Sequence, residues 1–188
     1  FDQRHLQSLG RIHGAAEADA AVTAAREAGF DNLSCDLIFA VPGQTLRDWE
    51  RDLRRLIAHA PEHVATYSLT YEPGTALTAR MRAGKVAVAD EEDELAMYET
   101  AIQTLADAGY RHYEISNFAR SGREARHNLA YWTWRDYLGV GAGAHGFSRL
   151  GSGCGPWGER YANRRLPADY MGANDGAWVD TRELIGRS

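Results

Sequence analysis

The sequence predicts an α/β protein in which parallel strands form one sheet and helices cover its outer face. Apolar, strand-like segments alternate with helical segments along residues 15–118. A local plan of helix, Ala-Gly-aromatic and strand also occurs twice, in REAGFDNLSCDLIF and in LADAGYRHYEISNF. Alternation and repetition of this kind are typical of successive α/β units, whose strands lie parallel in one sheet.

The first part of the alternating pattern is predicted to be two helices with one strand between them. Residues 15–29 are rich in strong helix formers and end at Gly29, the residue most often found in a left-handed helix cap. Residues 33–41 form a nearly continuous apolar run, which predicts a strand buried on both faces. Thr45 can cap the next helix, which we expect over residues 45–60.

Two further strands and one helix complete the pattern. We expect strands at 63–71 and 111–118, and a helix over 91–109 whose acidic first turn suits the positive end of the helix dipole. The three strands should lie side by side and parallel, with the three helices on one outer face, because crossover connections of one hand place their helices together. Polar side chains near the C-terminal ends of the strands favour an arc of a barrel over a small open sheet.

Composition limits the classes of partner. The 188 residues include 21 basic and 26 acidic side chains, giving a net charge of −5 without a dense basic block, so nucleic acid is not an expected partner. No uncharged apolar stretch of about 18 residues occurs, so we expect no transmembrane segment and a cytoplasmic protein. Cys35 and Cys154 lack CxxC spacing, and this segment alone is not expected to hold an iron–sulfur cluster. His13, His59 and His63 have no metal-binding spacing and are expected to be solvated.

Two charged residues in the first half are candidate binding groups. Asp36 lies within an apolar strand, where a carboxylate without partners would cost several kcal/mol, so it requires a partner such as ligand ribose hydroxyls. A structural ion pair would serve equally well. Arg11 could pin a carboxylate through its fixed fork of donors, although arginine is more often a surface residue. We expect both side chains to point into one concave side.

The glycine- and aromatic-rich region after the last strand is where binding is most expected. HNLAYW places His127 and Asn128 beside the aromatic residues Tyr131 and Trp132. A hydrophobic core would use the two aromatics equally well, whereas the imidazole and the carboxamide favour a site. In GVGAGAHG the glycines allow the backbone to approach a flat group closely, and His145 is a candidate ligand or hydrogen-bond donor.

Six segments in order carry a resemblance to a known family. They are FDQRHLQSLGRIH, GFDNLSCDLIFAVPGQT, HVATYSLTYEPGT, YEISNFAR, RHNLAYW and YLGVGAGAHG. Together they resemble the HemW family of radical S-adenosylmethionine (SAM) proteins, a group that also contains the oxygen-independent coproporphyrinogen III oxidases. The resemblance implies a partial (β/α) barrel that binds SAM and a [4Fe–4S] cluster. Residues 1–150 would form the second half of that barrel, and residues 151–188, with a short helix near 167–173, would begin the connection to a C-terminal domain absent from the chain.

The resemblance also implies roles for individual residues. Arg11 corresponds to a family position near the methionine carboxylate of SAM, Asp36 to one near its nucleoside, and Thr70 to one near the same cofactor. The cluster-binding cysteines would lie upstream, so this chain alone is expected to be inactive. A barrel arc without its neighbouring strands should also be poorly stable, because the missing half would cover its apolar face and its strand edge.

Two functions follow from the resemblance. HemW proteins are regarded as heme-binding chaperones that deliver heme to apoproteins, whereas the oxidases decarboxylate propionates of a porphyrinogen in porphyrin biosynthesis. HNxxYW resembles the HemW branch, with His127, Tyr131, Trp132 and His145 as candidate contacts of heme or porphyrin. The chaperone is the favoured interpretation, the oxidase is the alternative, and an α/β domain whose site is built elsewhere is the third.

Overall fold

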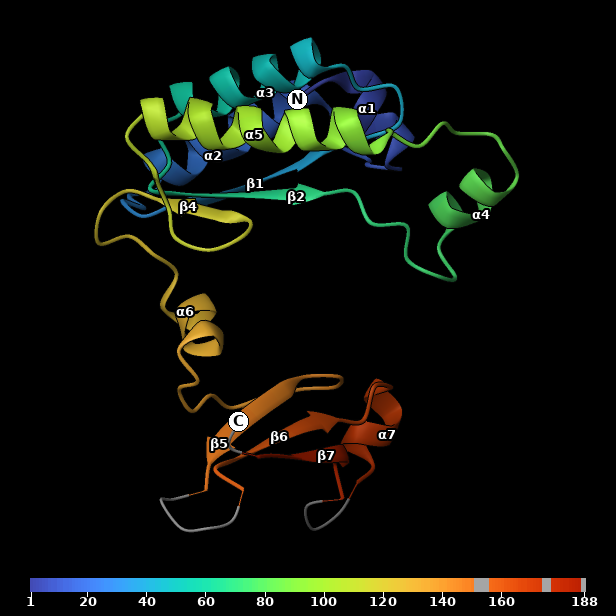
Figure 1. Cartoon of the computed structure of the whole chain (residues 1–188), viewed down its shortest axis with the longest axis vertical. Coiled ribbons are helices and arrows are strands. Elements are labelled where there is room, and N and C mark those ends of the chain that lie inside the picture. Colours follow the sequence, from blue (N-terminus) through green and yellow to red (C-terminus); the bar gives the residue numbers. More distant parts are fainter. Residues whose placement is uncertain (151–155, 174–176, 187–188) are drawn as a thin grey trace. The chain divides into compact units, whose positions relative to one another are not determined.

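The computed structural model describes residues 1–150, 156–173 and 177–186, and the chain divides into two compact units, Phe1–Glu124 and Ala125–Ser188 (Figure 1). We call them unit 1 and unit 2. The domain boundary near residue 150 was drawn from the family resemblance and concerns a longer protein, so it stays a prediction. Cys154 lies outside the described residues.

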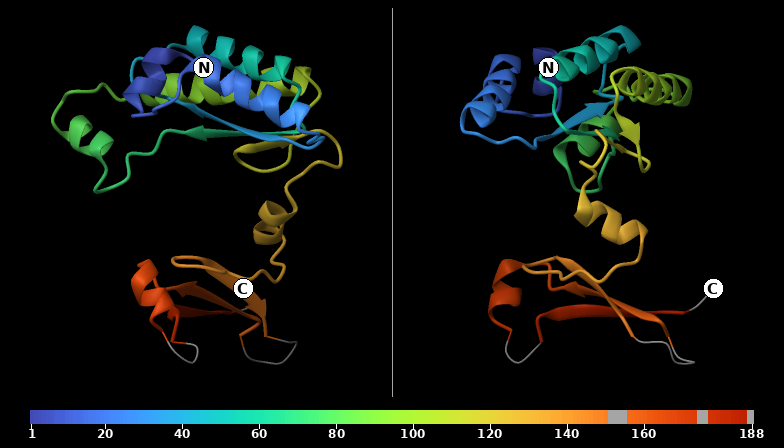
Figure 2. Two further views of the ribbon diagram at one scale, coloured as in Figure 1. Left: turned by 180° about the vertical axis from the view of Figure 1, so that it is seen from behind. Right: turned by 90° about the vertical axis from the view of Figure 1, so that its left-hand side faces the viewer.

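Unit 1 contains a four-stranded sheet in the order β1-β2-β4-β3. Its elements in chain order are α1 (Gln3–Ser8), α2 (Ala15–Glu27), β1 (Ser34–Phe39), α3 (Leu46–Ala58), β2 (His63–Ser68), α4 (Ala76–Arg82), α5 (Glu91–Asp107), β3 (Arg111–His112) and β4 (Asn117–Ala119). β1 and β2 pair in parallel, from Ser34 beside His63 to Phe39 beside Ser68. Figures 1 and 2 show α2, α3 and α5 on the same side of this sheet. The predictions of these three helices, their common side and the first parallel pair are thus confirmed.

The prediction that the third strand runs parallel to the others is wrong. RHYEISNF forms two short strands, and the later one, β4, pairs antiparallel with both β2 and β3. The chain reverses between them, where Tyr113 N donates to Asn117 O and Thr66 N donates to Ser116 O. The connection through α5 brings β3 back in the expected direction, but the returning strand β4 takes the place beside β2.

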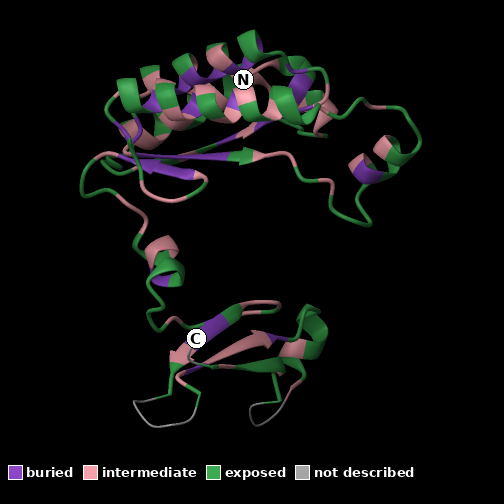
Figure 3. Cartoon of the chain, viewed as in Figure 1, coloured by how far each residue is buried: buried purple, intermediate pink, exposed green. Residues whose placement is uncertain are grey.

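The core of unit 1 lies between the sheet and two helices, where Figure 3 shows buried residues on their facing sides. Its main side chains are Leu37, Phe39, Val64 and Phe118 from the strands, Trp49, Leu53 and Leu56 from α3, and Met97, Ala101 and Leu105 from α5. Trp49 is fully buried and its indole Nε1 donates to the carbonyl of Met97 at 2.8 Å. This bond satisfies the one polar atom that the indole brings into the apolar layer.

β1 is not buried on both faces, which corrects the expectation from its apolar run. Leu37 and Phe39 are buried against the helices, whereas Ser34 and Asp36 are exposed on the opposite face. The helices α2, α3 and α5 lie on one side of the sheet (Figures 1 and 2), and side chains alternate between its two faces, so the other face of β1 remains open in unit 1. The Asp36 carboxylate therefore carries no large burial cost in this structure.

Local caps explain where the helices begin. Thr45 accepts a hydrogen bond from Asp48 N, and the Asp48 carboxylate accepts from Thr45 N, which forms the capping box of α3. Asp90 caps α5 in the same region of sequence where acidic residues predicted a helix start. Two short helices, α1 and α4, were not predicted, because six or seven residues carry too little periodicity to be recognised.

Unit 2 contains α6 (Arg126–Trp132), β5 (His145–Arg149), β6 (Gly158–Asn163), α7 (Pro167–Met171) and β7 (Val179–Ile185). The strands form an antiparallel sheet in the order β5-β6-β7. The short helix expected near 167–173 is confirmed by α7, whereas the sheet was not predicted. Gly158 faces the Phe147 ring, which lies 2.5 Å from where a Cβ would be, so only glycine allows these strands to pack this closely. Within the described ranges, no helix is long and apolar enough to cross a membrane.

Candidate functional site

A cavity of about 300 Å³ in unit 1 brings Arg11 and Asp36 together. Arg11 comes from the loop between α1 and α2, and Asp36 from the open face of β1. Both side chains are exposed, and in unit 1, which is described throughout, neither side chain forms a hydrogen bond or an ion pair. The shared cavity agrees with the prediction that the two residues point into one concave side.

The same cavity contains a buried polar atom without a partner. His5 is 7% exposed and lines the cavity, and its Nδ1 atom has no hydrogen-bond partner among the described residues. A buried ring nitrogen left unpaired costs about 1–3 kcal/mol, so a ligand that bonds to it is favoured. With a guanidinium, a carboxylate and an imidazole nitrogen, the cavity fits a ligand that carries both a carboxylate and hydroxyl groups. His5 was not predicted from the sequence, because no pattern in the residues around it indicates that its side chain is buried.

Thr70 does not join this group. Thr70 lies beyond the end of β2 and is exposed. Unit 1 is described throughout, and the residue of β2 that lines the cavity of Arg11 and Asp36 is Tyr67. β2 ends at Ser68, so the position two residues later has already left the strand.

His63 lies in a polar network on the open face of the sheet, and the expectation that it is solvated is wrong. It is 6% exposed, its Nδ1 atom lies 2.8 Å from Ser34 Oγ, and its Nε2 atom lies 2.9 Å from the Tyr113 hydroxyl. Burial lowers the pKa of His63, although the negative charges of Asp36 and Glu114 oppose that shift. The imidazole is therefore neutral near neutral pH. His59 is likewise paired, with Asp19.

In unit 2, α6 arranges the HNLAYW residues. His127 and Tyr131 are four residues apart on this helix, which places them on one face, and His127 Nε2 lies 3.1 Å from the Tyr131 hydroxyl. The Tyr137 ring packs on both, with centroids 4.3 Å from Tyr131 and 6.0 Å from His127. Asn128 keeps a buried side-chain oxygen without a partner among the described residues. The aromatic side chains thus gather where the sequence suggested a site.

These rings border a cavity of about 340 Å³ lined by Tyr131, Trp132, Trp134, Tyr137, Phe147 and Arg160. Tyr131 is 46% exposed and Trp132 is 52% exposed, so large aromatic surface stays open to solvent. Trp134 has a φ angle of 52°, a left-handed conformation that costs a bulky residue about 1 kcal/mol or more. The Arg160 guanidinium lies 5.8 Å from the Trp134 ring centroid. Such a cavity suits a flat apolar molecule with an anionic edge.

Two predicted residues lie outside the lining of this cavity. His127 contacts two residues of the lining, Tyr131 and Tyr137, and His145 is exposed on β5. Arg160 and Phe147 were missed, because they come from β6 and β5, and only strand pairing brings them beside the residues that follow α6. Nothing in the local sequence around Arg160 signals that placement.

The described residues do not fit a metal cluster. Among them, no group of three or more His, Cys, Asp or Glu side chains could hold a metal ion. Cys35 is a half-buried free thiol, and burial raises its pKa, which keeps it protonated. A [4Fe–4S] cluster, which needs several thiolates, is not supplied by this part of the chain.

Comparison with known proteins gives relatives named as heme chaperones and as radical SAM domain-containing proteins. No family model matches the chain. The heme chaperone HemW of Bacillus subtilis is 40% identical over 147 residues, which is 78% of this chain and 39% of that protein. HemW of Haemophilus influenzae is 38% identical over 91% of this chain and 43% of its own length. The mitochondrial radical S-adenosyl methionine domain-containing protein 1 of Danio rerio is 40% identical over 76% of this chain and 32% of its own length.

One solved structure has the same fold. The coproporphyrinogen III oxidase HemN of Escherichia coli, a radical SAM enzyme, matches 98% of this chain and 44% of its own chain with a TM-score of 0.73 and 19% sequence identity. The relatives thus define the chain as a radical SAM protein, and the fold agrees with that class. Within that class the chain belongs to the HemW family. It spans about two fifths of the length of the first bacterial relatives it matches.

Proposed function

We propose that the chain is part of a heme-binding chaperone that delivers heme to apoproteins, and that the cargo binds at the aromatic cavity of unit 2. This proposal rests on one observation: the exposed rings of Tyr131 and Trp132 line the same cavity as the cationic side chain of Arg160. A porphyrin is flat and apolar, with anionic propionates at one edge, so its chemistry matches that combination. The names of the bacterial relatives support the same function.

Each side chain would have a distinct role toward heme. Tyr131 and Trp132 offer ring faces for stacking. Arg160 donates to Glu183 through Nη1 at 3.3 Å and offers its other donors to a propionate. His127 would supply a nitrogen ligand to the heme iron, because its contact with the Tyr131 hydroxyl is one that an iron atom could replace. His145, exposed on β5, is proposed as a further porphyrin contact.

We propose that unit 1 binds SAM in the cavity beside β1. Arg11 would pair with the methionine carboxylate, Asp36 would accept hydrogen bonds from the ribose hydroxyls, and the free His5 Nδ1 atom would gain a partner. Thr70 would lie near the same cofactor, which requires the segment after β2 to approach the cavity in the intact protein. SAM bound at a reduced cluster supplies radical chemistry in this superfamily.

We also propose that the chain forms part of a partial barrel in the intact protein. The parallel pair β1-β2 with helices on one side supports an arc of a partial (β/α) barrel, and the likeness to HemN supports a radical SAM fold. The [4Fe–4S] cluster would be held by cysteines elsewhere in the intact protein. A cytoplasmic location suits the free thiol of Cys35, because reducing compartments keep cysteines unpaired.

An oxygen-independent coproporphyrinogen III oxidase is the second candidate. The fold likeness to HemN favours it, and a cavity with stacking rings and one arginine would also accept a porphyrinogen carboxylate. The two functions differ in outcome, because a chaperone retains heme without turnover, whereas the oxidase releases carbon dioxide.

Titration of the intact protein with heme, followed by absorption spectroscopy, tests the cargo site. We expect saturable heme binding. His127→Ala should weaken this binding and shift the Soret band of the bound heme, because the iron loses a nitrogen ligand. Arg160→Gln should weaken binding about tenfold, and Arg149→Gln, an exposed arginine on β5 outside the cavity lining, should leave it unchanged. Equal affinities of the Arg160 and Arg149 variants would exclude this cavity as the heme site.

A further inference from the structure

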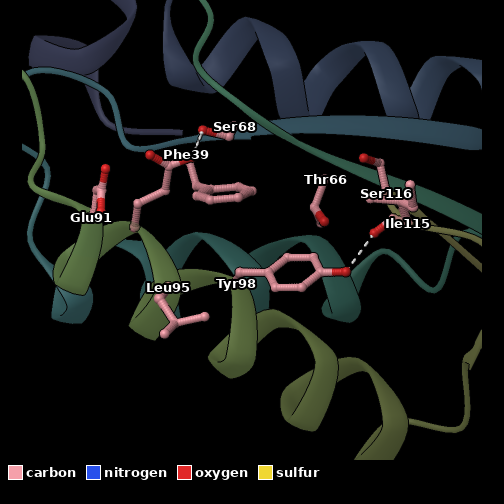
Figure 4. A pocket seen from close by; sticks show the side chains of 9 residues that line it. Phe39, Thr66, Ser68, Glu91, Leu95, Tyr98, Ile115 and Ser116 are labelled. Atoms are coloured by element: carbon pink, nitrogen blue, oxygen red, sulfur yellow. Dashed lines mark hydrogen bonds between the residues drawn. The ribbon is translucent and has the colours of Figure 1, made fainter.

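A second cavity of unit 1 lies on the helical side of the sheet, beneath the first turns of α5 (Figure 4). Its volume is about 420 Å³, and its lining includes Phe39 from β1, Thr66 and Ser68 from β2, and Glu94 and Tyr98 from α5. All residues of unit 1 are described, and this cavity shares no lining residue with the cavity of Arg11 and Asp36. The proposed SAM and heme sites therefore do not account for it.

One buried polar group in this cavity is unsatisfied. Thr66 is 1% exposed, and its hydroxyl has no hydrogen-bond partner among the described residues. Figure 4 shows the hydroxyl on the side of Tyr98, whose own hydroxyl donates to the carbonyl of Ile115 at 3.0 Å. A buried hydroxyl without a partner costs about 1–3 kcal/mol, and a hydrogen-bonding group of a ligand would remove that cost.

The other end of the cavity is acidic. Ser68 Oγ donates to a carboxylate oxygen of Glu94, and exposed Glu91 lines the same end. Both charged residues in the lining are acidic. The N-terminus of α5 stabilises these carboxylates, which explains their presence without a ligand, but it does not explain the unpaired Thr66 hydroxyl.

The surface between the two ends is apolar and partly open. The rings of Phe39 and Tyr98 lie 6.5 Å apart and nearly parallel, and Leu95 and Ile115 are 55% and 62% exposed. Thr66 and Ser68 are two residues apart on β2, so their Cα atoms lie about 6.6 Å apart. Thr66 is at the hydrogen-bonding end of the cavity, and Ser68 contacts Glu94 at the acidic end.

We propose that this cavity binds an arylalkylamine, with an ammonium group at Glu91 and Glu94, an aromatic ring against Phe39 and Tyr98, and a hydroxyl at Thr66. A para-hydroxyphenyl ring with a two-carbon amine chain carries these three groups, the hydroxyl, the ring and the ammonium, in that order. The charge of the acidic end selects a cation, and an ammonium bonded to a carboxylate is one of the stronger recognition elements available to a small ligand.

Calorimetric titration of the intact protein with tyramine, phenethylamine and 4-ethylphenol tests this site. We expect tyramine to bind with a stoichiometry of one, phenethylamine to bind about fivefold more weakly because it lacks the hydroxyl, and 4-ethylphenol to bind at least tenfold more weakly because it lacks the ammonium. Thr66→Val should weaken tyramine to the level of phenethylamine and leave phenethylamine unchanged.

A matched pair of α5 variants separates recognition from helix stability. Glu94→Gln should weaken tyramine at least tenfold, whereas Glu92→Gln, in the same first turn but outside the cavity lining, should not. Glu91→Gln, an exposed position, serves if Glu94→Gln does not fold. The proposal is overturned if tyramine shows no saturable binding, if 4-ethylphenol binds as tightly as tyramine, or if the Glu94 or Glu91 variant behaves like the Glu92 variant.

Discussion

Replacing Asp36 by asparagine separates a binding role from a structural one. The Asp36 side chain is exposed on the open face of β1 and has no hydrogen bond or ion pair in the described unit, so Asp36→Asn should change the free energy of unfolding by no more than about 0.5 kcal/mol. If its carboxylate accepts the ribose hydroxyls of SAM, the lost hydrogen bonds to a charged group are worth about 1.5–3 kcal/mol. SAM affinity should therefore fall about tenfold to a hundredfold.

Asp48→Asn is the matched control for this experiment. Asp48 is 9% exposed, and its carboxylate accepts from Thr45 N, from Thr45 Oγ1 and from Arg51 Nη2. The Thr45 hydrogen bonds, with the Arg51 charge, hold the pKa of Asp48 below its usual value. This substitution should cost about 1–2 kcal/mol of stability and leave SAM affinity unchanged.

Urea denaturation and equilibrium SAM binding, both on intact protein with a reconstituted cluster, measure the two quantities. An Asp36→Asn variant that loses more than about 1.5 kcal/mol of stability would identify a structural carboxylate and refute the reasoning from exposure. Unchanged SAM affinity would remove Asp36 from the proposed site.

Three further predictions concern stability. The ordinary pKa of histidine is 6.5, and burial lowers the pKa of His63 in the folded protein. As the pH falls below 6.5, the unfolded chain takes up a proton while the folded His63 stays neutral, so the unfolding free energy should decrease until the pH passes the lowered pKa of folded His63. His63→Gln should flatten that part of the pH profile of stability. Trp49→Phe should cost about 1–3 kcal/mol in urea denaturation, because the core loses the indole–Met97 hydrogen bond and part of the volume of a fully buried side chain, and a loss near zero would contradict this role. Gly146→Ala should cost more than about 2 kcal/mol and broaden melting, because its Cβ would overlap the Tyr161 ring, and an unchanged melt would show that this ring shifts freely.

The sequence predicted the elements whose signals are local. Gly29 takes the left-handed conformation expected after α2, and Thr45 begins α3 as its capping box requires. The hairpin in RHYEISNF was missed because the apolar content suits one strand, and only the pairing of Ser116 and Asn117 with β2 reveals that the chain turns back. Asp36 was expected to be buried because a run of apolar residues does not show whether one face of a sheet or both faces are covered.

The candidate sites were predictable in part for the same reason. Arg11 and Asp36 were chosen from the sequence, and the fold brings them into one cavity. The HNLAYW aromatics were also chosen, whereas Arg160 enters their cavity through the antiparallel pairing of β5 and β6, a contact between residues far apart in sequence. Non-local contacts of this kind carry no periodicity that a single sequence displays.

The most direct test of the proposed chaperone function uses one anaerobically reconstituted sample of the intact protein. Heme binding is measured by absorption spectroscopy, and carbon dioxide release from coproporphyrinogen III is measured with SAM present in the same preparation. The account predicts stoichiometric heme binding that His127→Ala weakens, without decarboxylation. SAM-dependent carbon dioxide release, with heme binding that neither His127→Ala nor Arg160→Gln alters, would contradict it and assign the chain to an oxidase.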